Sequence, residues 1–198
     1  VLGIRPLLWK NGWPVAGEVF KEGTYEIESE RRGYALELAV DFVRMEYTRH
    51  RFWEKDDTPV VPLKSQTLED VIGTWPQGKI NVRIGDYMFR PHQKWTITAV
   101  PDGGGYLGGP YYKIVIEGTN RALAATADAE VVTVPEFTGA PEQLWRIDQL
   151  TDGTYRIMPK EVPGTDKELV LVSVGDSTPS LGEFDMNSDN SKWNFRDH

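Results

Sequence analysis

Apolar and polar side chains alternate with a period of two along much of the chain, which is the pattern of half-buried β-strands. Clusters rich in Gly, Asp, Asn and Pro separate these stretches, for example at residues 102–105, 117–120, 151–153 and 162–164. Such clusters favour turns. The pattern therefore predicts an all-β fold of short strands joined by tight turns.

Three short sequence motifs, called marks below, recur along the chain in a fixed order. Strands open around a Tyr in the stretches 23–27, 109–114 and 153–157, and a second strand follows at 34–38, 121–125 and 169–172. The units close at Gln93-Lys94-Trp95, Gln143-Leu144-Trp145 and Ser191-Lys192-Trp193. The closing tryptophans lie 50 and 48 residues apart. This regularity predicts three copies of one unit, at about 17–100, 101–150 and 151–198.

A four-strand unit of about forty residues cannot bury its own apolar face. Three such units around a pseudo-threefold axis can close a short barrel with one shared core. The closing tryptophans are therefore interpreted as core residues rather than ligand contacts.

The first unit is longer than the others and predicts an insertion of about thirty residues between Ala39 and Asn81. Within it, residues 41–47 alternate like a strand, whereas residues 67–73 fit either one helical turn or a loop. Phe52, Trp53 and Trp75 leave three alternatives open: these aromatic residues cover one end of the barrel, contact a neighbouring domain, or stack on sugar.

Composition narrows the function. The net charge of −8 argues against a nucleic-acid partner, since phosphate contacts need clustered Lys and Arg. Basic residues do gather at 44–55, but acidic residues interleave with them, which is typical of a solvated face. The chain has no Cys, and no apolar run reaches the length of about 18–20 residues that a membrane helix needs.

The triple Q-x-W closing motif, together with the Gly-Thr-Tyr openings, resembles the ricin-type β-trefoil family of lectins and carbohydrate-binding modules. The resemblance covers residues 17–198. It implies a β-trefoil with three Q-x-W-type repeats, the first carrying the insertion, and a function in binding carbohydrate.

Residues 1–16 carry a second resemblance. The motifs at 5–9, Arg-Pro-Leu-Leu-Trp, and at 11–15, Asn-Gly-Trp-Pro-Val, resemble the last strand of the five-bladed propeller in glycoside hydrolase family 43. The alternative is an ordinary edge strand that packs on the trefoil. The resemblance implies a parent enzyme that degrades arabinan or arabinoxylan, with its catalytic carboxylates in an upstream propeller. It also implies an extracellular, periplasmic or cell-surface protein whose signal peptide lies upstream.

In the ricin-type family, each unit offers a shallow pocket. An acidic residue comes from the second strand, an aromatic residue from the third, and an Asn or His completes it beside the Q-x-W motif. In the first unit this pattern implies a site of Glu37, Tyr87, Arg90, His92 and Gln93. In the third unit it implies Phe184, Asn187 and Asn190, with Val172 in the acidic position unless Asp176 reaches in. The second unit has Ala124 in the acidic position, the aromatic position near Pro135, and Glu142 before the motif, so it is expected to be purely structural.

Each candidate also has a simpler interpretation. Tyr87 and Phe184 are equally compatible with the rim of the barrel core, and His92 with a turn histidine. Asn187 and Asn190 fit turn caps through Asx hydrogen bonds. Glu37 lies between Leu36 and Leu38, so its carboxylate needs a partner or solvent.

No motif in the sequence predicts catalysis, a metal site or a cofactor. The three His lack metal-ligand spacing, the glycines at 103–105 lack the lysine of a phosphate loop, and no Ser–His–Asp order is evident. Three hypotheses remain. The chain is a non-catalytic carbohydrate-binding module, a structural domain that docks on the hydrolase propeller, or a free-standing enzyme or protease inhibitor of trefoil fold.

Overall fold

The computed structural model describes residues 7–10, 13–16, 19–30, 34–40, 67–88, 90–106, 109–174 and 178–197. Four strands fall in each predicted repeat. The first repeat contains β3 (Gly23–Ser29), β4 (Tyr34–Leu38), β5 (Ile80–Asp86) and β6 (Trp95–Tyr106). The second contains β7 (Gly109–Ile116), β8 (Ala122–Ala125), β9 (Val131–Val134) and β10 (Trp145–Gln149). The third contains β11 (Tyr155–Pro159), β12 (Val170–Val174), β13 (Thr178–Gly182) and β14 (Trp193–Asp197).

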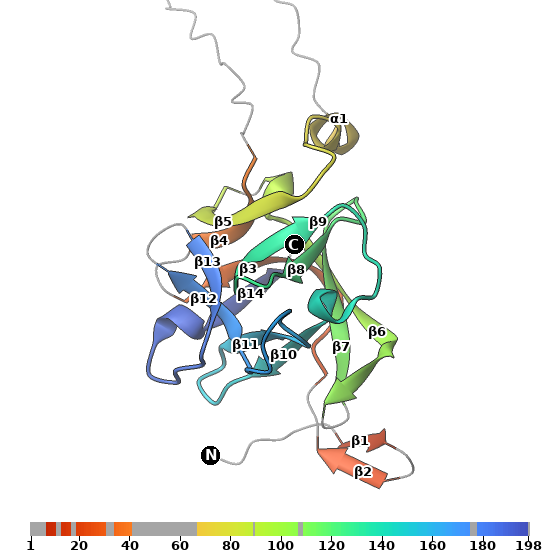
Figure 1. Ribbon diagram of the computed structural model, residues 1–198, viewed down its shortest axis with the longest axis vertical. Coiled ribbons are helices and arrows are strands. Elements are labelled where there is room, and N and C mark those ends of the chain that lie inside the picture. The colour runs from red at the N-terminus through yellow and green to blue at the C-terminus, as the bar shows by residue number, and fades with distance from the viewer. Residues whose placement is uncertain are drawn as a thin grey trace, which may run out of the picture.

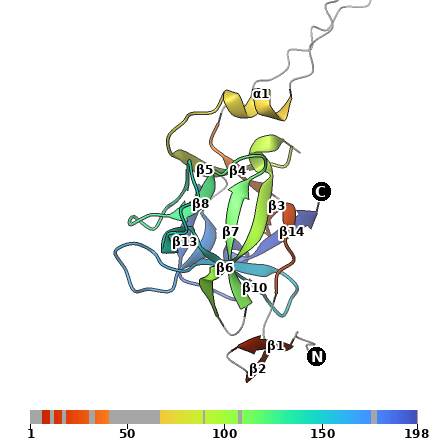
Figure 2. The same cartoon turned by 90° about the vertical axis from the view of Figure 1, so that its right-hand side faces the viewer.

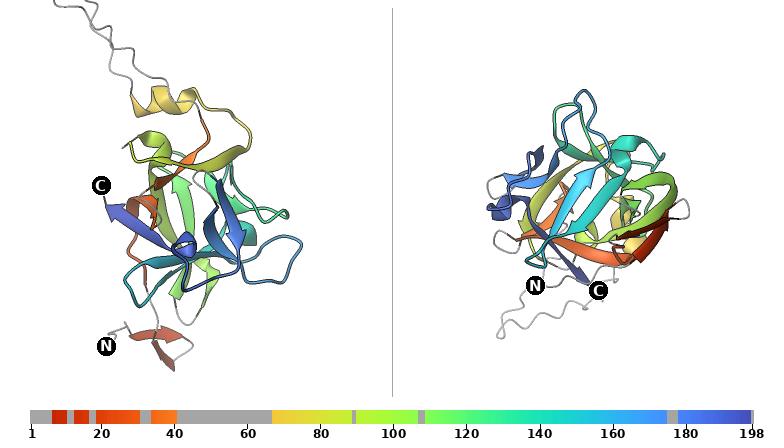
Figure 3. Two further views of the ribbon diagram at one scale, coloured as in Figure 1. Left: turned by 90° about the vertical axis from the view of Figure 1, so that its left-hand side faces the viewer. Right: turned by 90° about the horizontal axis from the view of Figure 1, so that it is seen from below.

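The first and fourth strands of the repeats close into a barrel. The antiparallel pairs run β3–β6, β6–β7, β7–β10, β10–β11, β11–β14 and β14–β3, which returns to the starting strand. The ring is visible from below in Figure 3. The second and third strands form the hairpins β4–β5, β8–β9 and β12–β13. This arrangement is a β-trefoil, so the predicted fold class is confirmed.

The tyrosine and tryptophan marks hold equivalent places in the three repeats. Each opening Tyr is the cross-strand partner of the closing Trp of its own repeat, in the pairs Tyr25–Trp95, Tyr112–Trp145 and Tyr155–Trp193. Each indole Nε1 donates to a leucine carbonyl of the second strand, namely Leu36 at 2.8 Å, Leu123 at 2.9 Å and Leu171 at 2.8 Å. All three tryptophans are fully buried. Their prediction as core residues is therefore confirmed.

Phe20 closes the barrel on its axis. Its ring lies against the opening tyrosines of all three repeats, with centroid separations of 5.2 Å to Tyr25, 6.0 Å to Tyr112 and 5.6 Å to Tyr155. The ring of Phe195 adds a fourth contact at 4.5 Å. Tilted and edge-on aromatic packing of this kind stabilises beyond simple burial. Phe20 therefore joins the three repeats into one core.

The insertion leaves and rejoins the trefoil at neighbouring backbone positions, because the Ala39 N–H donates to the Asn81 carbonyl at 2.8 Å. Of the two alternatives for residues 67–73, the structure shows the helix, as α1 (Leu68–Gly73). Thr67 caps it, and Asp70 completes a capping box.

The end of the insertion packs on the trefoil. Trp75 is 6% exposed and belongs to the core, which fits the alternative in which it covers the barrel. Arg121 donates to the carbonyls of Pro76 and Gly78 at 2.8 and 2.7 Å and holds this segment against the second repeat. The expected strand at 41–47, the basic residues at 44–55, and Phe52 and Trp53 lie outside the described residues.

The N-terminal segment contains two strands rather than the single closing strand expected. β1 (Leu7–Lys10) and β2 (Trp13–Ala16) form an antiparallel hairpin. The hairpin and α1 lie at opposite ends of the molecule (Figures 1 and 2). Within the described ranges, no helix has the length and apolar character needed to cross a membrane.

Candidate functional site

The carboxylate of Glu37 is the centre of a polar cluster inside the first repeat. Its Oε1 accepts a hydrogen bond from Arg83 Nε at 2.5 Å, and its Oε2 is bonded to Gln93 Nε2 at 2.7 Å and His92 Nε2 at 3.1 Å. We refer to Glu37, Arg83, His92 and Gln93 as the Glu37 cluster. It brings together three of the five residues predicted for the first unit.

The hairpin β4–β5 positions this carboxylate. Glu37 and Arg83 are cross-strand partners, and Gly85 follows two residues later on the same face of β5. A Cβ at Gly85 would lie 2.6 Å from Glu37 Oε1, so the carboxylate needs a glycine beneath it. Arg83 was not predicted, because the long insertion between β4 and β5 prevents the register of the two strands from being inferred from the sequence.

Electrostatics keep Glu37 ionised although its side chain is only 3% exposed. Burial favours the neutral acid, but hydrogen bonds from His92, Arg83 and Gln93 outweigh it and hold the pKa of the carboxyl below its ordinary value of 4.5. The Arg83 side chain is 40% exposed and also donates to the Val40 carbonyl at 3.0 Å. The cluster thus presents a partly exposed guanidinium beside a buried carboxylate.

The residue at the Q-x-W glutamine position, Gln in two repeats and Ser in the third, makes internal hydrogen bonds in each repeat. Gln93 lies in the 3-10 turn η1 (Pro91–Gln93), where its Oε1 accepts from Met88 N–H at 2.9 Å and its Nε2 also donates to the Asp86 carbonyl at 2.7 Å. Gln143 in η2 (Pro141–Gln143) accepts from Thr138 N–H at 2.7 Å. In η3 (Asp189–Ser191), Ser191 Oγ donates to the Asp185 carbonyl at 2.9 Å. The buried Gln93 amide is therefore occupied by bonds within the chain.

An aromatic ring follows the third strand in every repeat, and a basic side chain from the barrel covers it. The cation-to-centroid distances are 4.6 Å for Arg196 over Tyr87, 5.4 Å for Lys113 over Phe137, and 4.9 Å for Arg156 over Phe184. In the second unit, the sequence placed this aromatic position near Pro135. The structure corrects this, because Phe137 occupies it. Phe137 precedes Trp145 by the same eight residues that separate Tyr87 from Trp95, and this spacing was the signal that could have found it.

The remaining candidates are more exposed. Arg90 is exposed at the N-cap of η1. Asn187 is exposed, and its backbone N–H donates to Asp185 Oδ1 at 2.9 Å, while the Asn190 N–H donates to Ser188 Oγ at 3.3 Å. The side chains that cap these turns are therefore those of Asp185 and Ser188.

The indole hydrogen bonds also fix which residues are equivalent to Glu37. Because Leu36, Leu123 and Leu171 accept the same bond, Ala124 and Val172 take the place of Glu37 in the second and third repeats. Both are apolar, as the sequence indicated. Asp176, considered as a substitute carboxylate, lies outside the described residues. No group of three or more His, Cys, Asp or Glu able to hold a metal ion occurs within the described part of the chain.

Comparison with known proteins agrees with the β-trefoil fold. Residues 91–179 match the sequence profile of the family described as Ricin-type beta-trefoil lectin domain-like. The match supports a ricin-type β-trefoil lectin-like domain. No curated protein sequence matches the chain.

Solved structures show the same fold as this lectin-like domain. The designed threefold-symmetric protein ThreeFoil is 19% identical with a TM-score of 0.56, and the comparison covers 89% of this chain and 99% of that one. The Polyporus squamosus lectin, solved with the epitope Neu5Aca2-6Galb1-4GlcNAc, is 16% identical with a TM-score of 0.57, over 90% of this chain and 50% of that one. An exo-beta-1,3-galactanase from Clostridium thermocellum is 15% identical with a TM-score of 0.54, over 93% of this chain and 32% of that one. The chain thus spans half of the lectin chain and about a third of the galactanase chain.

Proposed function

We propose that the chain is a non-catalytic carbohydrate-binding module and that the Glu37 cluster forms its principal sugar site. A sugar site in water needs fixed acceptors and donors for the hydroxyls and an apolar face for the ring. The cluster supplies the partly exposed guanidinium of Arg83, which the buried carboxylate of Glu37 holds in place. Tyr87, half-buried directly after β5, supplies the aromatic surface.

The observation that carries this proposal is the buried carboxylate of Glu37, which pairs with Arg83 Nε at 2.5 Å. Burying a charge costs free energy even when it is paired, and an apolar residue in the same place would avoid that cost. The equivalent positions in the other repeats hold Ala124 and Val172, so the trefoil frame does not need a carboxylate there. A buried carboxylate kept in only one repeat is explained by its bond to Arg83 Nε, which holds that partly exposed guanidinium in place for the hydroxyl groups of a ligand.

The N-terminal motifs are the basis for proposing which polysaccharide the module binds. Their resemblance to the family 43 propeller supports a module attached to a hydrolase of arabinan or arabinoxylan, acting outside the cell or at its surface. The galactanase neighbour, of whose chain the structural match covers 32%, is compatible with the same arrangement of a hydrolase with a trefoil module. The sequence that precedes Val1 in the gene would test this attachment, since it should encode a propeller with paired carboxylates.

Affinity electrophoresis tests the site. The chain is run through native gels containing arabinan, arabinoxylan or galactan and compared with gels without polysaccharide. We expect the wild type to be retarded, and Arg83→Ala and Tyr87→Ala to lose most of the retardation. Lys79→Ala, an exposed cation before β5, is the charge-matched control and should migrate as the wild type does. Wild-type mobility that no polysaccharide changes would overturn the proposal.

A structural role is the second candidate, and one observation favours it. The rings of Tyr87 and Phe184 are each covered on one face by an arginine, and the Glu37 carboxylate is satisfied within the chain. Such a domain would shape the hydrolase without binding sugar itself. Deleting the module from the parent enzyme separates the two roles. A binding tether should affect turnover on polymer alone, whereas a structural domain should also affect short soluble oligosaccharides.

A further inference from the structure

The third repeat departs from threefold symmetry in its first loop. The opening Tyr and the Leu that accepts the indole bond are 11 residues apart in the first repeat, from Tyr25 to Leu36, and the second repeat repeats this spacing. In the third repeat the separation from Tyr155 to Leu171 is 16 residues. The five extra residues lie in the segment 160–169 between β11 and β12.

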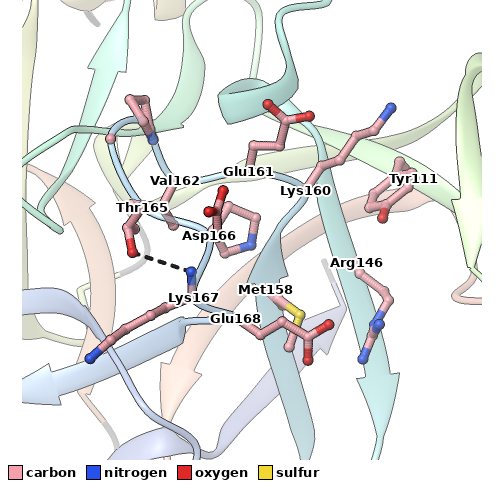
Figure 4. A pocket seen from close by; sticks show the side chains of 13 residues that line it. Tyr111, Arg146, Met158, Lys160, Glu161, Val162, Thr165, Asp166, Lys167 and Glu168 are labelled. Atoms are coloured by element: carbon pink, nitrogen blue, oxygen red, sulfur yellow. Dashed lines mark hydrogen bonds between the residues drawn. The ribbon is translucent and has the colours of Figure 1, made fainter.

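The longer loop has a defined conformation. Its start is fixed by Lys160 N–H, which donates to the Leu144 carbonyl at 2.7 Å. A backbone bridge joins Val162 to Thr165, with Gly164 at a φ of +81° in the turn between them. Thr165 Oγ1 then accepts from Lys167 N–H at 3.2 Å (Figure 4). Because a loop that is already ordered loses little entropy on binding, it is suited to form one wall of a site.

The loop forms one side of an open cavity of about 610 Å³ against the outside of the barrel. Figure 4 shows Thr165, Asp166 and Lys167 of the loop on one side and Tyr111 and Arg146 of the barrel on the other. This volume lies within the range of about 300–1,000 Å³ that is usual for small-ligand sites. The cavity is separate from the Glu37 cluster, since it is lined by β7, β10, β11 and the 160–168 loop.

The wall of the cavity that contains Lys160 and Arg146 is held by its own contacts. Lys160 Nζ donates to the Gly103 carbonyl at 2.7 Å and lies 5.3 Å from the centroid of the Tyr111 ring. Arg146 Nε pairs with Asp148 at 2.8 Å. The donors on this wall are therefore fixed in place before any ligand arrives.

The chemistry of the lining indicates a neutral, hydroxyl-rich ligand. Three cationic and three acidic side chains line the cavity, namely Arg146, Lys160, Lys167, Glu161, Asp166 and Glu168. Their formal charges cancel, so the lining itself favours neither a cation nor an anion. Closely mixed donors and acceptors match the hydroxyl groups of a saccharide, and the rings of Tyr111 and Pro163 offer apolar surface for its C–H faces.

We propose that this cavity is a further saccharide subsite, specific for a neutral sugar and independent of the three repeat pockets. The inference rests on the proposed function, because it assigns the same class of ligand. It adds a second point of contact in the third repeat. Arg156, which pairs with Asp148 at 2.7 Å beside Arg146, also covers the Phe184 ring, so the subsite and Phe184 lie along one outer face of β10 and β11. A polysaccharide chain bound across this face would gain avidity from both.

Isothermal titration with neutral arabino-, xylo- and galacto-oligosaccharides of graded length tests the subsite. Asp166→Ala and Glu168→Ala remove exposed acceptors of the lining without touching the core. For the longer oligosaccharides, we expect each to weaken binding about tenfold, as the loss of a hydrogen bond worth about 1.4 kcal/mol would. Asp128→Ala, on the exposed β8–β9 loop, is the control and should bind as the wild type does.

The outcomes separate the two proposals. Wild-type binding that Asp166→Ala and Glu168→Ala leave unchanged would overturn the subsite and leave the proposed function standing. Wild-type binding that both variants weaken, with Asp128→Ala unaffected, supports the subsite. A wild-type chain that binds none of the sugars would overturn both.

Discussion

Replacing Glu37 by Gln keeps the shape of the side chain and removes its charge. The variant therefore measures directly how much that charge contributes to the free energy of unfolding. The carboxylate accepts bonds from Arg83, Gln93 and His92. The Gln amide can keep its carbonyl oxygen toward Gln93 and His92, which turns its NH₂ group toward Arg83 Nε, another donor. The variant then loses one charge-assisted bond and weakens the other two, because their acceptor becomes neutral.

A lost bond to a charged group costs about 1.5–3 kcal/mol, and partly exposed Arg83 can turn to water and recover some of it. We therefore expect Glu37→Gln to lower the free energy of unfolding by roughly 2 kcal/mol at pH 7. In a domain of this size, that loss lowers the midpoint of thermal unfolding by about 4–8 °C. Glu136→Gln, an exposed glutamate bonded to Asn120, is the control and should stay within about 0.5 kcal/mol of wild type.

The same variant carries a pH test. Since the folded-state pKa of Glu37 lies below its ordinary value of 4.5, its contribution is complete above that pH and is lost as the pH falls through the folded value. The stability difference between wild type and Glu37→Gln should therefore shrink as the pH is lowered below about 4.5. Denaturant unfolding at a series of pH values measures it. Equal stabilities at pH 7, or a difference that persists undiminished at low pH, would refute the electrostatic account of the cluster.

Three further predictions concern the frame of the trefoil. Substituting Phe for a closing tryptophan (Trp95, Trp145 or Trp193) leaves a buried leucine carbonyl without its donor. We therefore expect each substitution to lower the free energy of unfolding, measured with denaturant, by at least about 2 kcal/mol and by similar amounts at the three sites. Sharply unequal losses would contradict the equivalence of the three tryptophans. Phe20→Ala should lower the free energy of unfolding by about 3–5 kcal/mol, because its ring contacts all three opening tyrosines. A change below about 1 kcal/mol would contradict the role of Phe20 in joining the three repeats into one core. Gly85→Ala should cost about 1–3 kcal/mol because its Cβ meets the Glu37 carboxylate, and most of that cost should vanish in a Glu37→Ala background, as a double-mutant cycle would show.

The sequence predicts the ring because the residues that build it repeat. Tyr and Trp recur at matched spacing, and in the structure each opening Tyr pairs with the closing Trp of its own repeat, as with Tyr25 and Trp95. Local alternation and spacing carry that information. Phe20 was not predicted as a core residue, because it occurs once and precedes the first mark.

The candidate site could be predicted only in part. Glu37 and Gln93 follow from their places beside repeated marks, but Arg83 becomes their neighbour only through the register of β4 against β5, which the segment 39–79 conceals. The saccharide subsite was missed for a related reason. The spacing from Tyr to Trp shows that the third repeat is five residues longer than the second. Only the alignment on Leu36, Leu123 and Leu171, which the indole bonds reveal, places the extra residues in the 160–169 loop.

Residue-resolved sugar titration by NMR tests the central claim most directly. Backbone and side-chain resonances would be followed while arabino-oligosaccharides, xylo-oligosaccharides and galacto-oligosaccharides are added. The account predicts shifts that centre on Arg83, Tyr87 and His92, with a second group in residues 160–168. Spectra that stay unchanged with every sugar, or shifts confined to surfaces away from both groups, would contradict it.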